Sequence, residues 1–480
     1  MTHADIFVLS PLIVLAGTAL VVMLSIAFYR CHILSALLTL LGIALSFVTL
    51  IRTYSFLPHQ ITSLLILDHY AFFYTGLILA ASFIVVVLSY GYLKKREGNN
   101  EEFYILLLLA IFGSTVLVSS SHFASLFLGL EILSVSLYAL IAYLRSSNRS
   151  IEAGIKYLIL AAASAAFLLF GMALIYAELG TMSFAGIASI ARGTQNVFIY
   201  TGLSMIIVGL GFKLAVVPFH MWTPDVYEGA PAPVTAFIAT VSKGAVFALL
   251  LRYFTLLNLH VHSSLFLIFS IIAIASMFFG NLLALFQNNV KRILAYSSIA
   301  HLGYLLVAFL ASSTYAFTAV AFYLIAYFIT TLGAFGIITV LSGSQREPDK
   351  IDDYYGLAAR RPWLSYVFIA MLLSLAGIPL TAGFIGKFYI LRAGIGSSLW
   401  LLVVALVINS AMGLFYYLRI VVAMFRQPAG NVGVEDSFAS VKISMTDTMS
   451  LAVLTILLLW LGVYPSTFID MIQMIGSRMG

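Results

Sequence analysis

The sequence predicts an all-α polytopic membrane protein with about 14 transmembrane helices. Of its 480 residues, 62% are hydrophobic and only 9% are charged, and the mean hydropathy is +1.08. A water-soluble protein of this length needs far more charged surface. Apolar runs of about 20 residues also recur along the chain, and each can span a bilayer as a helix. Together these observations exclude a soluble fold.

Fourteen segments have the length and composition of a spanning helix. We expect the first segment to be retained, because it is too long for the core of a signal peptide and no Lys or Arg precedes it. The only cysteine, Cys31, permits no internal disulfide and no cysteine-based metal or iron–sulfur site. The predicted helices are 6–28, 33–52, 69–93, 102–119, 122–144, 154–178, 198–222, 232–256, 263–286, 291–311, 314–342, 362–397, 399–425 and 446–468.

The basic residues favour a topology with both termini on the outer side of the membrane, because Lys and Arg accumulate in inner loops. If the number of predicted helices were wrong, the basic residues would not separate so clearly into inner and outer loops. The same loop positions explain the basic pI of about 9.2 without nucleic-acid binding. The sixteen inner residues are Arg30, Lys94, Lys95, Arg96, Arg145, Arg149, Lys156, Lys291, Arg292, Arg346, Lys350, Arg360, Arg361, Arg419, Arg426 and Lys442, and the five outer residues are Arg52, Arg192, Arg252, Arg392 and Arg478.

Two predicted helices are interrupted. The segment 200–233 contains four prolines, and the segment 362–397 contains Gly377-Ile378-Pro379. An unbroken helix over the second segment would be about 54 Å long, well beyond the bilayer core of about 30 Å. Proline breaks survive in a membrane only where protein or water covers the freed backbone. Interrupted helices in corresponding places therefore indicate an ion or substrate site of a transporter.

The interrupted helices are the seventh and the twelfth, which suggests two five-helix units formed by helices 4–8 and 9–13. Because five is odd, the second unit would be inverted relative to the first. Direct sequence similarity between the units is limited to GFK at 211–213 and GFIGK at 383–387. We therefore expect four parts: three N-terminal helices in 1–100, the first unit in 101–258, the inverted unit in 259–428 and a C-terminal helix in 429–480.

Five ionisable residues fall deep inside the predicted spans: Glu131, Lys213, Lys243, His301 and Lys387. Counted at 1.5 Å per residue, each lies roughly 14–20 Å from a membrane face, so all five share one depth. A charge there costs about 2.5–3.5 kcal/mol on insertion scales. A structural ion pair or buried hydrogen bond is the alternative for any one of them, and for His301 alone it is an equal alternative. Five at one depth favour a lateral proton relay.

In this relay Glu131 and Lys213 are expected to form a switchable pair, since a carboxylate is the natural counter-charge of a buried lysine. Lys243 and His301 would pass the proton laterally, and Lys387 would exchange it near the far end. Imidazole suits such relay work because it titrates near neutral pH.

Two further residues are weaker candidates. Lys156 begins the sixth predicted helix and could take up protons or merely fix the inner interface. His220, together with Asp225 and Glu228, lies beside the first break and could line an inner entrance or merely cap it.

Redox chemistry is not expected in this chain. The sequence has no glycine motif for a nucleotide following a strand, and no histidine pairs placed across helices for haem. If the protein works in a redox machine, the electrons travel through other subunits.

Three long motifs resemble the antiporter-like membrane subunits of respiratory complex I. They are GFKLAVVPFHMWTPDVYEGAPAPV (211–234), VKRILAYSSIAHLGY (290–304) and SLAGIPLTAGFIGKFY (374–389). The resemblance covers nearly the whole chain and is strongest for the bacterial NADH-quinone oxidoreductase subunit N group. Subunit L carries a long C-terminal lateral helix that is missing here, and subunit M usually has glutamate at the position of Lys387.

This resemblance implies 14 helices, inverted five-helix repeats and a proton channel across the midplane. It implies that Glu131, Lys213, Lys243 and Lys387 occupy the family's key charged positions, with His301 in the connecting path. It also implies a bacterial inner-membrane location with periplasmic termini, and partners among the antiporter-like and small membrane subunits of complex I. NADH, FMN, iron–sulfur clusters and quinone would then be bound by partner subunits.

Two alternatives remain open from the sequence. A multi-subunit cation/proton antiporter shares the fold that the resemblance implies. A non-conducting structural subunit is the other alternative, but such a protein would gain stability by replacing its midplane charges with apolar residues.

Overall fold

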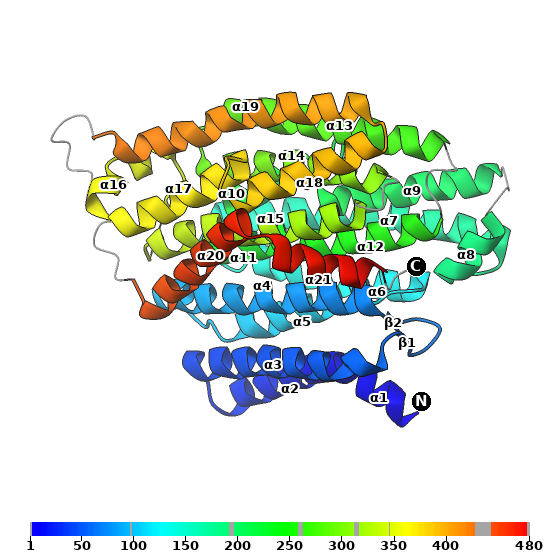
Figure 1. Cartoon of the computed structure of the whole chain (residues 1–480). Coiled ribbons are helices and arrows are strands. Elements are labelled where there is room, and N and C mark those ends of the chain that lie inside the picture. Colours follow the sequence, from blue (N-terminus) through cyan, green and yellow to red (C-terminus); the bar gives the residue numbers. More distant parts are fainter. Residues whose placement is uncertain are drawn as a thin grey trace.

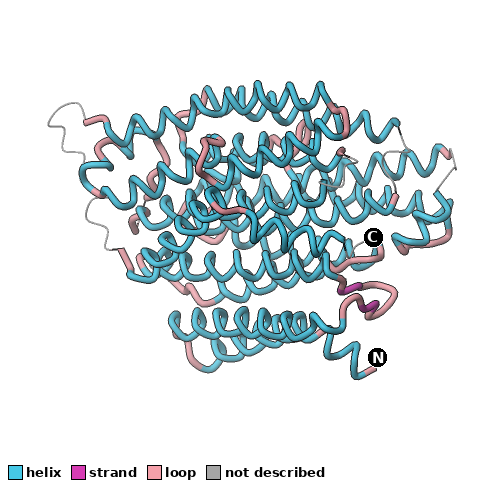
Figure 2. The backbone as a smooth tube through the Cα atoms, viewed as in Figure 1, coloured by secondary structure: helices cyan, strands magenta, loops and turns pink. Residues whose placement is uncertain are grey.

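The computed structural model describes residues 2–96, 98–191, 196–257, 263–311, 316–344, 346–427 and 443–477. Arg192, Lys442 and Arg478 of the predicted loop sets lie outside these residues. The described chain is a bundle of long helices that run side by side, as Figures 1 and 2 show. The prediction of an all-α polytopic architecture is confirmed.

The first part of the chain forms three helices, a short antiparallel hairpin and then the helices that lead to the first interruption. Its elements are α1 (His3–Val8), α2 (Ser10–Phe28), α3 (His32–Thr53), η1 (Tyr54–Phe56), β1 (His59–Gln60), β2 (Ile66–Leu67), α4 (His69–Lys94), α5 (Glu102–Val118), α6 (Phe123–Ile141), α7 (Asn148–Leu179), α8 (Phe184–Ala191), α9 (Val197–Leu214), α10 (Trp222–Gly229), α11 (Ala232–Phe237), the π-helix η2 (Ile238–Ser242) and α12 (Lys243–Leu256).

The second part continues with helices only, among the residues that the structure describes. Its elements are α13 (Ser263–Leu285), α14 (Val290–Leu310), α15 (Ala316–Leu341), η4 (Ile351–Tyr354), α16 (Leu357–Arg360), α17 (Pro362–Ala376), α18 (Ala382–Gly396), α19 (Trp400–Phe425), α20 (Met445–Val463) and α21 (Ser466–Ser477).

Twelve spans within the described residues are long and apolar enough to cross a membrane, and α5 and α17 are shorter apolar helices. Polar caps fix several of the helix starts. Asp68 accepts from the amide of Ala71 at the start of α4, and Asn289 accepts from the amide of Arg292 at the start of α14. Such side chains satisfy amides that have no partner inside the helix.

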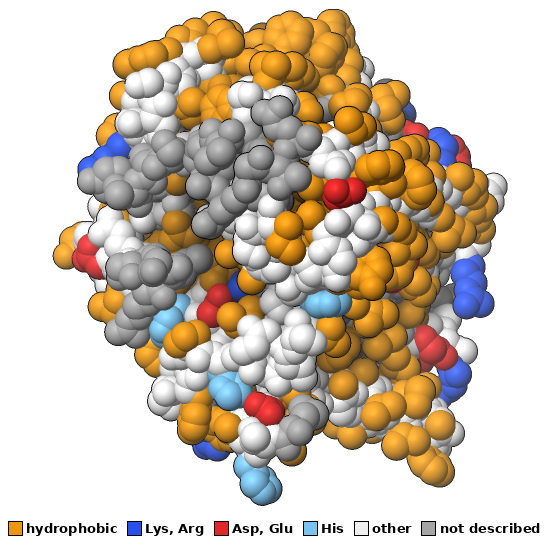
Figure 3. Space-filling model, turned by 90° about the vertical axis from the view of Figure 1, so that its right-hand side faces the viewer, with side chains coloured by type: hydrophobic (Ala, Val, Ile, Leu, Met, Phe, Trp, Pro, Cys, Tyr) orange, Lys and Arg blue, Asp and Glu red, His pale blue; other side chains and the backbone are white. Residues whose placement is uncertain are grey.

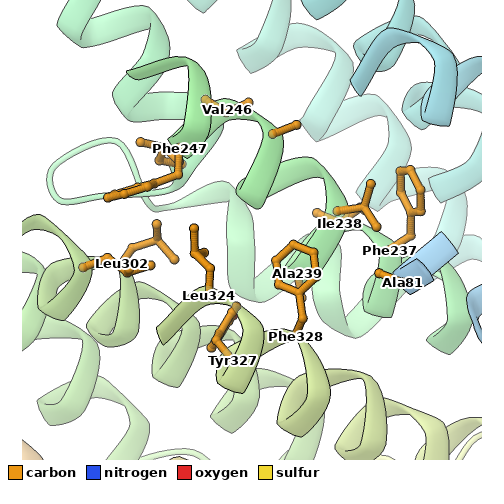
Figure 4. Packing of buried hydrophobic residues seen from close by; sticks show 14 of the residues in the cluster. Ala81, Phe237, Ile238, Ala239, Val246, Phe247, Leu302, Leu324, Tyr327 and Phe328 are labelled. Atoms are coloured by element: carbon orange, nitrogen blue, oxygen red, sulfur yellow. The ribbon is translucent and has the colours of Figure 1, made fainter. Parts of the chain in front are cut away.

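The centre of the bundle is formed by α15, by α14 and by the continuous rod α11–η2–α12, which are buried along nearly their whole length. Figure 4 shows Leu324 and Phe328 of α15 pointing toward the rod, while Phe237 of the rod lies beside Ala81 of α4. Gly244 permits this approach, because a Cβ there would lie 2.4 Å from the Phe328 ring. Lys243, the residue before it, is thereby held at the middle of the bundle.

The peripheral helices expose apolar side chains, in contrast to a soluble protein. Exposed Leu, Ile, Val and Phe residues follow the outer faces of α2, α3, α7 and α19. Figure 3 views the end of the bundle that carries α1, and hydrophobic side chains cover much of its outline. The final turn of α21 lies at this same end (Figure 1). An apolar belt of this kind suits a hydrocarbon environment.

Both predicted interruptions are present, but their positions and number differ from the expectation. The first helix ends at Leu214, with Ala215 in the left-handed conformation, rather than continuing to 222. The second break falls at Gly377, as predicted, with φ of +85°. A third irregularity, the π-helix before Lys243, has no proline or glycine to announce it. Mid-helix π segments occur frequently at functional sites.

Three other differences concern boundaries. The helix that carries Lys156 begins at Asn148 rather than 154, because Ser147 caps it. The final predicted span ends at Val463, before Pro465, and the chain continues as the separate helix α21. Lys291, assigned to an inner loop, lies in the first turn of α14 and is 1% exposed.

Candidate functional site

Lys213 of α9 reaches α6, the helix that carries Glu131. Lys213 is buried and donates to the Ser134 hydroxyl at 2.7 Å, one turn beyond Glu131 on the same helix. The Lys213 ammonium lies 5.7 Å from the Tyr157 ring centre. Glu131 Oε1 is buried and has no hydrogen-bond partner among the described residues. The structure therefore places Lys213 against the helix that carries Glu131, and the atom it contacts there is the Ser134 hydroxyl oxygen.

Lys243 donates to the Ser298 hydroxyl of α14 at 2.6 Å. Two phenols meet the same oxygen: Tyr327 donates to it at 2.9 Å, and the Tyr227 hydroxyl lies 3.4 Å away. The Lys243 ammonium also lies 5.2 Å from the Tyr227 ring centre. Ser298 is thus a junction that joins the lysine to two titratable hydroxyl groups.

His301 follows Ser298 by one turn on the same face of α14, and both of its ring nitrogens have partners. Nδ1 lies 2.5 Å from the Tyr323 hydroxyl of α15, and Nε2 lies 3.2 Å from the Tyr417 hydroxyl of α19. Tyr417 is in turn hydrogen-bonded to Ser297. The imidazole therefore bridges two helices through groups that can both donate and accept protons.

Lys387 lies on α18, six residues beyond its N-cap Thr381, and reaches back to the break. Its ammonium donates to the Ala376 carbonyl, the last of α17, and to the Ser410 hydroxyl of α19, both at 2.8 Å. Its distance from the Tyr304 ring centre is 5.2 Å. A cation at this place satisfies a terminal carbonyl and complements the negative end of the α17 dipole.

A small cavity lies between His301 and Lys387. Its volume is about 10 Å³, close to the space that one water molecule needs. Tyr323, Tyr327 and Ser374 also line it. The cavity therefore places the imidazole and the lysine on one small space.

The weaker candidates belong to a different environment, close to the starts of α7 and α10. Lys156 is 43% exposed and contacts Asp225 at 2.8 Å and Glu152 at 2.7 Å. Arg292 also donates to Asp225, at 2.7 Å. His220 is buried in the turn before α10. Lys156 therefore belongs to an exposed ion-pair network, separate from the midplane residues.

A buried ion pair that the sequence did not indicate lies nearby. Lys291 donates to Glu347 at 2.7 Å and to the Ala230 carbonyl at 2.7 Å. Glu347 also accepts from the amide of Ala232 at 3.0 Å and from the Tyr92 hydroxyl. The pair thus holds the α10–α11 junction from both sides.

The carboxylates of this inner loop differ in their electrostatics. Burial favours the neutral form of Glu347, but Lys291 offsets it, and the pKa of Glu347 is lowered from its usual value. Burial raises the pKa of Asp349 to about 6, although Lys291 opposes the shift. Asp349 therefore changes charge close to neutral pH, whereas Glu347 stays ionised.

The contacting hydroxyls were also missed by the sequence reasoning, although a signal was available. Ser134 follows Glu131 by three residues, and Ser298 precedes His301 by three. On a helix this spacing places two side chains on one face. A search for hydroxyl residues three or four positions from each midplane charge would have identified both Ser134 and Ser298.

Among the described residues there is no group of three or more His, Cys, Asp or Glu side chains placed to hold a metal ion. The side chains that meet at the site are lysine, imidazole, phenol and hydroxyl groups, each of which can donate or accept a proton. This fits the five midplane residues, four of which are at most 7% exposed.

Comparison with known proteins decides the family. The family model described as NADH:quinone oxidoreductase/Mrp antiporter, transmembrane, matches residues 120–413. A curated NADH-quinone oxidoreductase subunit N from Nitrosospira multiformis is 53% identical over 99% of this chain and 97% of its own length. The chain belongs to the NADH-quinone oxidoreductase subunit N family. It is a multi-pass membrane protein of the antiporter-like class.

Solved structures agree with this family. A chain of respiratory complex I from Thermus thermophilus with bound aureothin superposes with a TM-score of 0.82 at 31% identity, covering 96% of this chain and 98% of that one. A chain of the Mrp complex from Dietzia sp. DQ12-45-1b reaches a TM-score of 0.87 at 18% identity, covering 100% and 98%. The second similarity shows the shared fold alone. Members of this fold work within multi-subunit membrane complexes.

Proposed function

We propose that this subunit N family member moves protons across the bacterial inner membrane, driven by electron transfer from NADH to quinone in partner subunits. The relay would run through Glu131, Lys213, Lys243, His301 and Lys387. The observation that carries the proposal is the polar chain on α14, where Ser298 receives Lys243 and His301 follows one turn later. The family membership supports the setting of a proton-translocating subunit.

The relay alternates between groups that hold a full charge and groups that pass a proton. Hydroxyls of Ser134, Ser298 and Ser410 contact the three lysines. Tyrosine hydroxyls contact His301 on both sides. Since each hydroxyl can accept and donate in turn, a proton can move without large side-chain displacement. A lysine with a purely structural role would need only acceptors that cannot pass a proton on, such as backbone carbonyls.

Glu131 marks one end of this relay. It is only half-buried within the chain, and a carboxylate at the bilayer midplane is costly against lipid. We infer that a neighbouring membrane subunit covers it and offers a hydrogen-bond donor. This would connect the relay to the next subunit of the complex.

The remaining parts of the proposal concern topology and cofactors. Two inverted five-helix units, spanning α5–α12 and α13–α19, are supported by the breaks at Ala215 and Gly377 in the corresponding helices. We place the end that carries α1 and α21 on the periplasmic side, since the predicted inner loops hold most of the basic residues. NADH, FMN, iron–sulfur clusters and quinone would be bound by partner subunits.

The test is proton pumping by the intact complex that contains Lys213→Ala or Glu131→Ala. We expect both variants to assemble, and coupled electron transfer and pumping to fall by about tenfold or more, since one essential proton carrier is removed. Lys94→Ala serves as the matched control, because it removes an exposed lysine in the last turn of α4. Normal pumping in both midplane variants would refute the relay.

A cation/proton antiporter subunit is the second candidate, because the Mrp chain shares this fold. The subunits that co-purify in mild detergent separate the two. A peripheral arm that oxidises NADH supports the respiratory complex, whereas sodium-dependent growth at high pH without NADH oxidation supports the antiporter.

A further inference from the structure

A groove of about 1100 Å³ opens at the inner end of the bundle. One wall is the final part of α19, from Phe415 to Arg426. The opposite wall is the loop from Arg346 to Tyr355, and the ends of α7 and α14 close the groove. None of the five midplane residues lines it, so the groove is separate from the relay.

The two walls differ in chemistry. On α19, Phe415 is 64% exposed and Val422 is 63% exposed, and both belong to the helix face that is apolar along its length. The loop wall is charged. The whole lining holds five basic and three acidic residues: Arg149, Arg346, Lys350, Arg419 and Arg426 against Glu228, Asp349 and Asp352. A net positive groove therefore opens beside an apolar helix face.

Internal ion pairs use only some of these charges. Arg149 lies 3.7 Å from Glu228 and 3.6 Å from Asp349, and Arg346 pairs with Asp353. Lys350 and Arg426 are exposed, and neither forms an ion pair with a carboxylate of the described residues.

Two details show that the basic side chains are set up around the groove. The Arg426 guanidinium lies 5.6 Å from the Tyr355 ring centre, which holds it beside the loop. Arg419 donates to the carbonyls of Leu285 and Gln287, so its charge is fixed at the groove wall. The groove therefore keeps two exposed cations, Lys350 and Arg426, next to exposed apolar surface.

We propose that this groove binds the headgroup of an anionic phospholipid from the inner leaflet. The phosphodiester would lie against Lys350 and Arg426, and an acyl chain would follow Phe415 and Val422 along α19. Basic pockets between helices at the inner side of a membrane suit such headgroups. A soluble anion would leave the apolar wall uncovered, whereas a lipid matches both walls.

The test is site-specific photo-crosslinking in the assembled complex. Phe415 is replaced by the photoreactive residue benzoylphenylalanine, and the complex is placed in nanodiscs of phosphatidylethanolamine and phosphatidylglycerol. We expect adducts with phospholipid that are enriched in phosphatidylglycerol. The double variant Lys350→Ala/Arg426→Ala should lower that enrichment by about thirtyfold at most, about fivefold for each charge.

A matched control uses the same photoreactive residue at Leu401, which is 74% exposed at the opposite end of α19. Its adducts should show no headgroup preference and no response to the double variant. Crosslinking of the Phe415 probe to another polypeptide, lipid adducts without headgroup preference, or loss of the adduct on adding inorganic phosphate would each overturn the proposal. Because no relay residue is altered, these outcomes are independent of proton pumping.

Discussion

The two interrupted helices place their lysines differently relative to the break. In the first, Lys213 precedes the break at Ala215 and donates to Ser134 on another helix. The break itself is held by other groups. Trp222 donates from Nε1 to the Phe212 carbonyl at 2.9 Å, and the amide of Val217 donates to the Ser276 hydroxyl at 2.9 Å.

In the second, Lys387 follows the break at Gly377 and donates back to the Ala376 carbonyl. We call the break at Ala215 the first joint and the break at Gly377 the second joint. At the second joint the lysine ammonium also closes the break, so a mutation of Lys387 should impair both proton pumping and the local backbone structure. At the first joint different residues carry the charge and hold the break, so mutation should separate the two effects.

Lys387→Ala should have the largest effect, because it removes both a relay charge and a charge-assisted hydrogen bond. Pumping should be lost, and amide exchange in 374–386 should speed up by about ten- to a hundredfold, the equivalent of a bond to a charged group. Lys213→Ala should abolish pumping while exchange in 211–222 stays unchanged. Exchange mass spectrometry on the assembled complex measures both.

Ser410→Ala is the matched control for Lys387. It removes the other acceptor of the same ammonium and a long 3.5 Å bond to the Ala376 carbonyl, but it keeps the 2.8 Å bond from Lys387 to that carbonyl. Its exchange in 374–386 should stay close to that of the wild type. If Lys387→Ala also leaves exchange there unchanged, the second joint does not depend on its lysine and the comparison fails.

Gly244→Ala should have the next largest effect on pumping and stability. It tests whether the position of Lys243 depends on local packing, as that of Lys387 depends on its break. The added methyl would overlap the Phe328 ring beside Lys243, and overpacking of this kind costs about 1–3 kcal/mol. We expect lower thermal stability together with reduced pumping, because the rod carries the lysine. Gly17→Ala on α2, where a Cβ meets nothing within 4 Å, is the control. Equal stability of the two variants would contradict this packing argument.

The ionisation of Asp349 should make the stability of the first joint depend on pH, while that of the second joint does not. The loop that carries it holds the α10–α11 junction through Glu347 and Lys291, and it has no such role at the second joint. The pKa of Asp349 is about 6 when folded, above an unfolded value of about 3.9. The folded loop therefore binds the proton more tightly, and its stability falls as pH rises from about 4 to about 6.

Asp349→Asn should remove this loss, which is on the order of 3 kcal/mol. Amide exchange in 346–354 should be slower than in the wild type above about pH 6 and equal to it below about pH 4. Exchange in 374–386 should not change at either pH. A variant whose loop exchanges like the wild type at both pH values would show that Asp349 ionisation does not strain this joint.

The sequence predicted the parts of this molecule that hydrophobicity and proline dictate. Apolar runs located the spanning helices, Gly377-Ile378-Pro379 located the second break, and depth counting brought out the midplane lysines. It could not predict the π-helix before Lys243, because no residue type marks it and tertiary packing decides it. The Lys291–Glu347 pair was missed for a similar reason, since only the fold brings residues 56 positions apart into contact.

Trp222→Phe should have the smallest effect, and it tests the first joint alone. The substitution keeps the ring but removes the donor to the Phe212 carbonyl, a neutral bond worth about 1 kcal/mol. Exchange in 211–222 should speed up by about fivefold, while pumping stays within about twofold of the wild type, because Lys213 keeps its contact with Ser134. Trp363→Phe, at an exposed tryptophan of α17, provides the control. Loss of pumping equal to that of Lys213→Ala would mean that relay and structure are joined at the first break as well, and the two joints would then work alike.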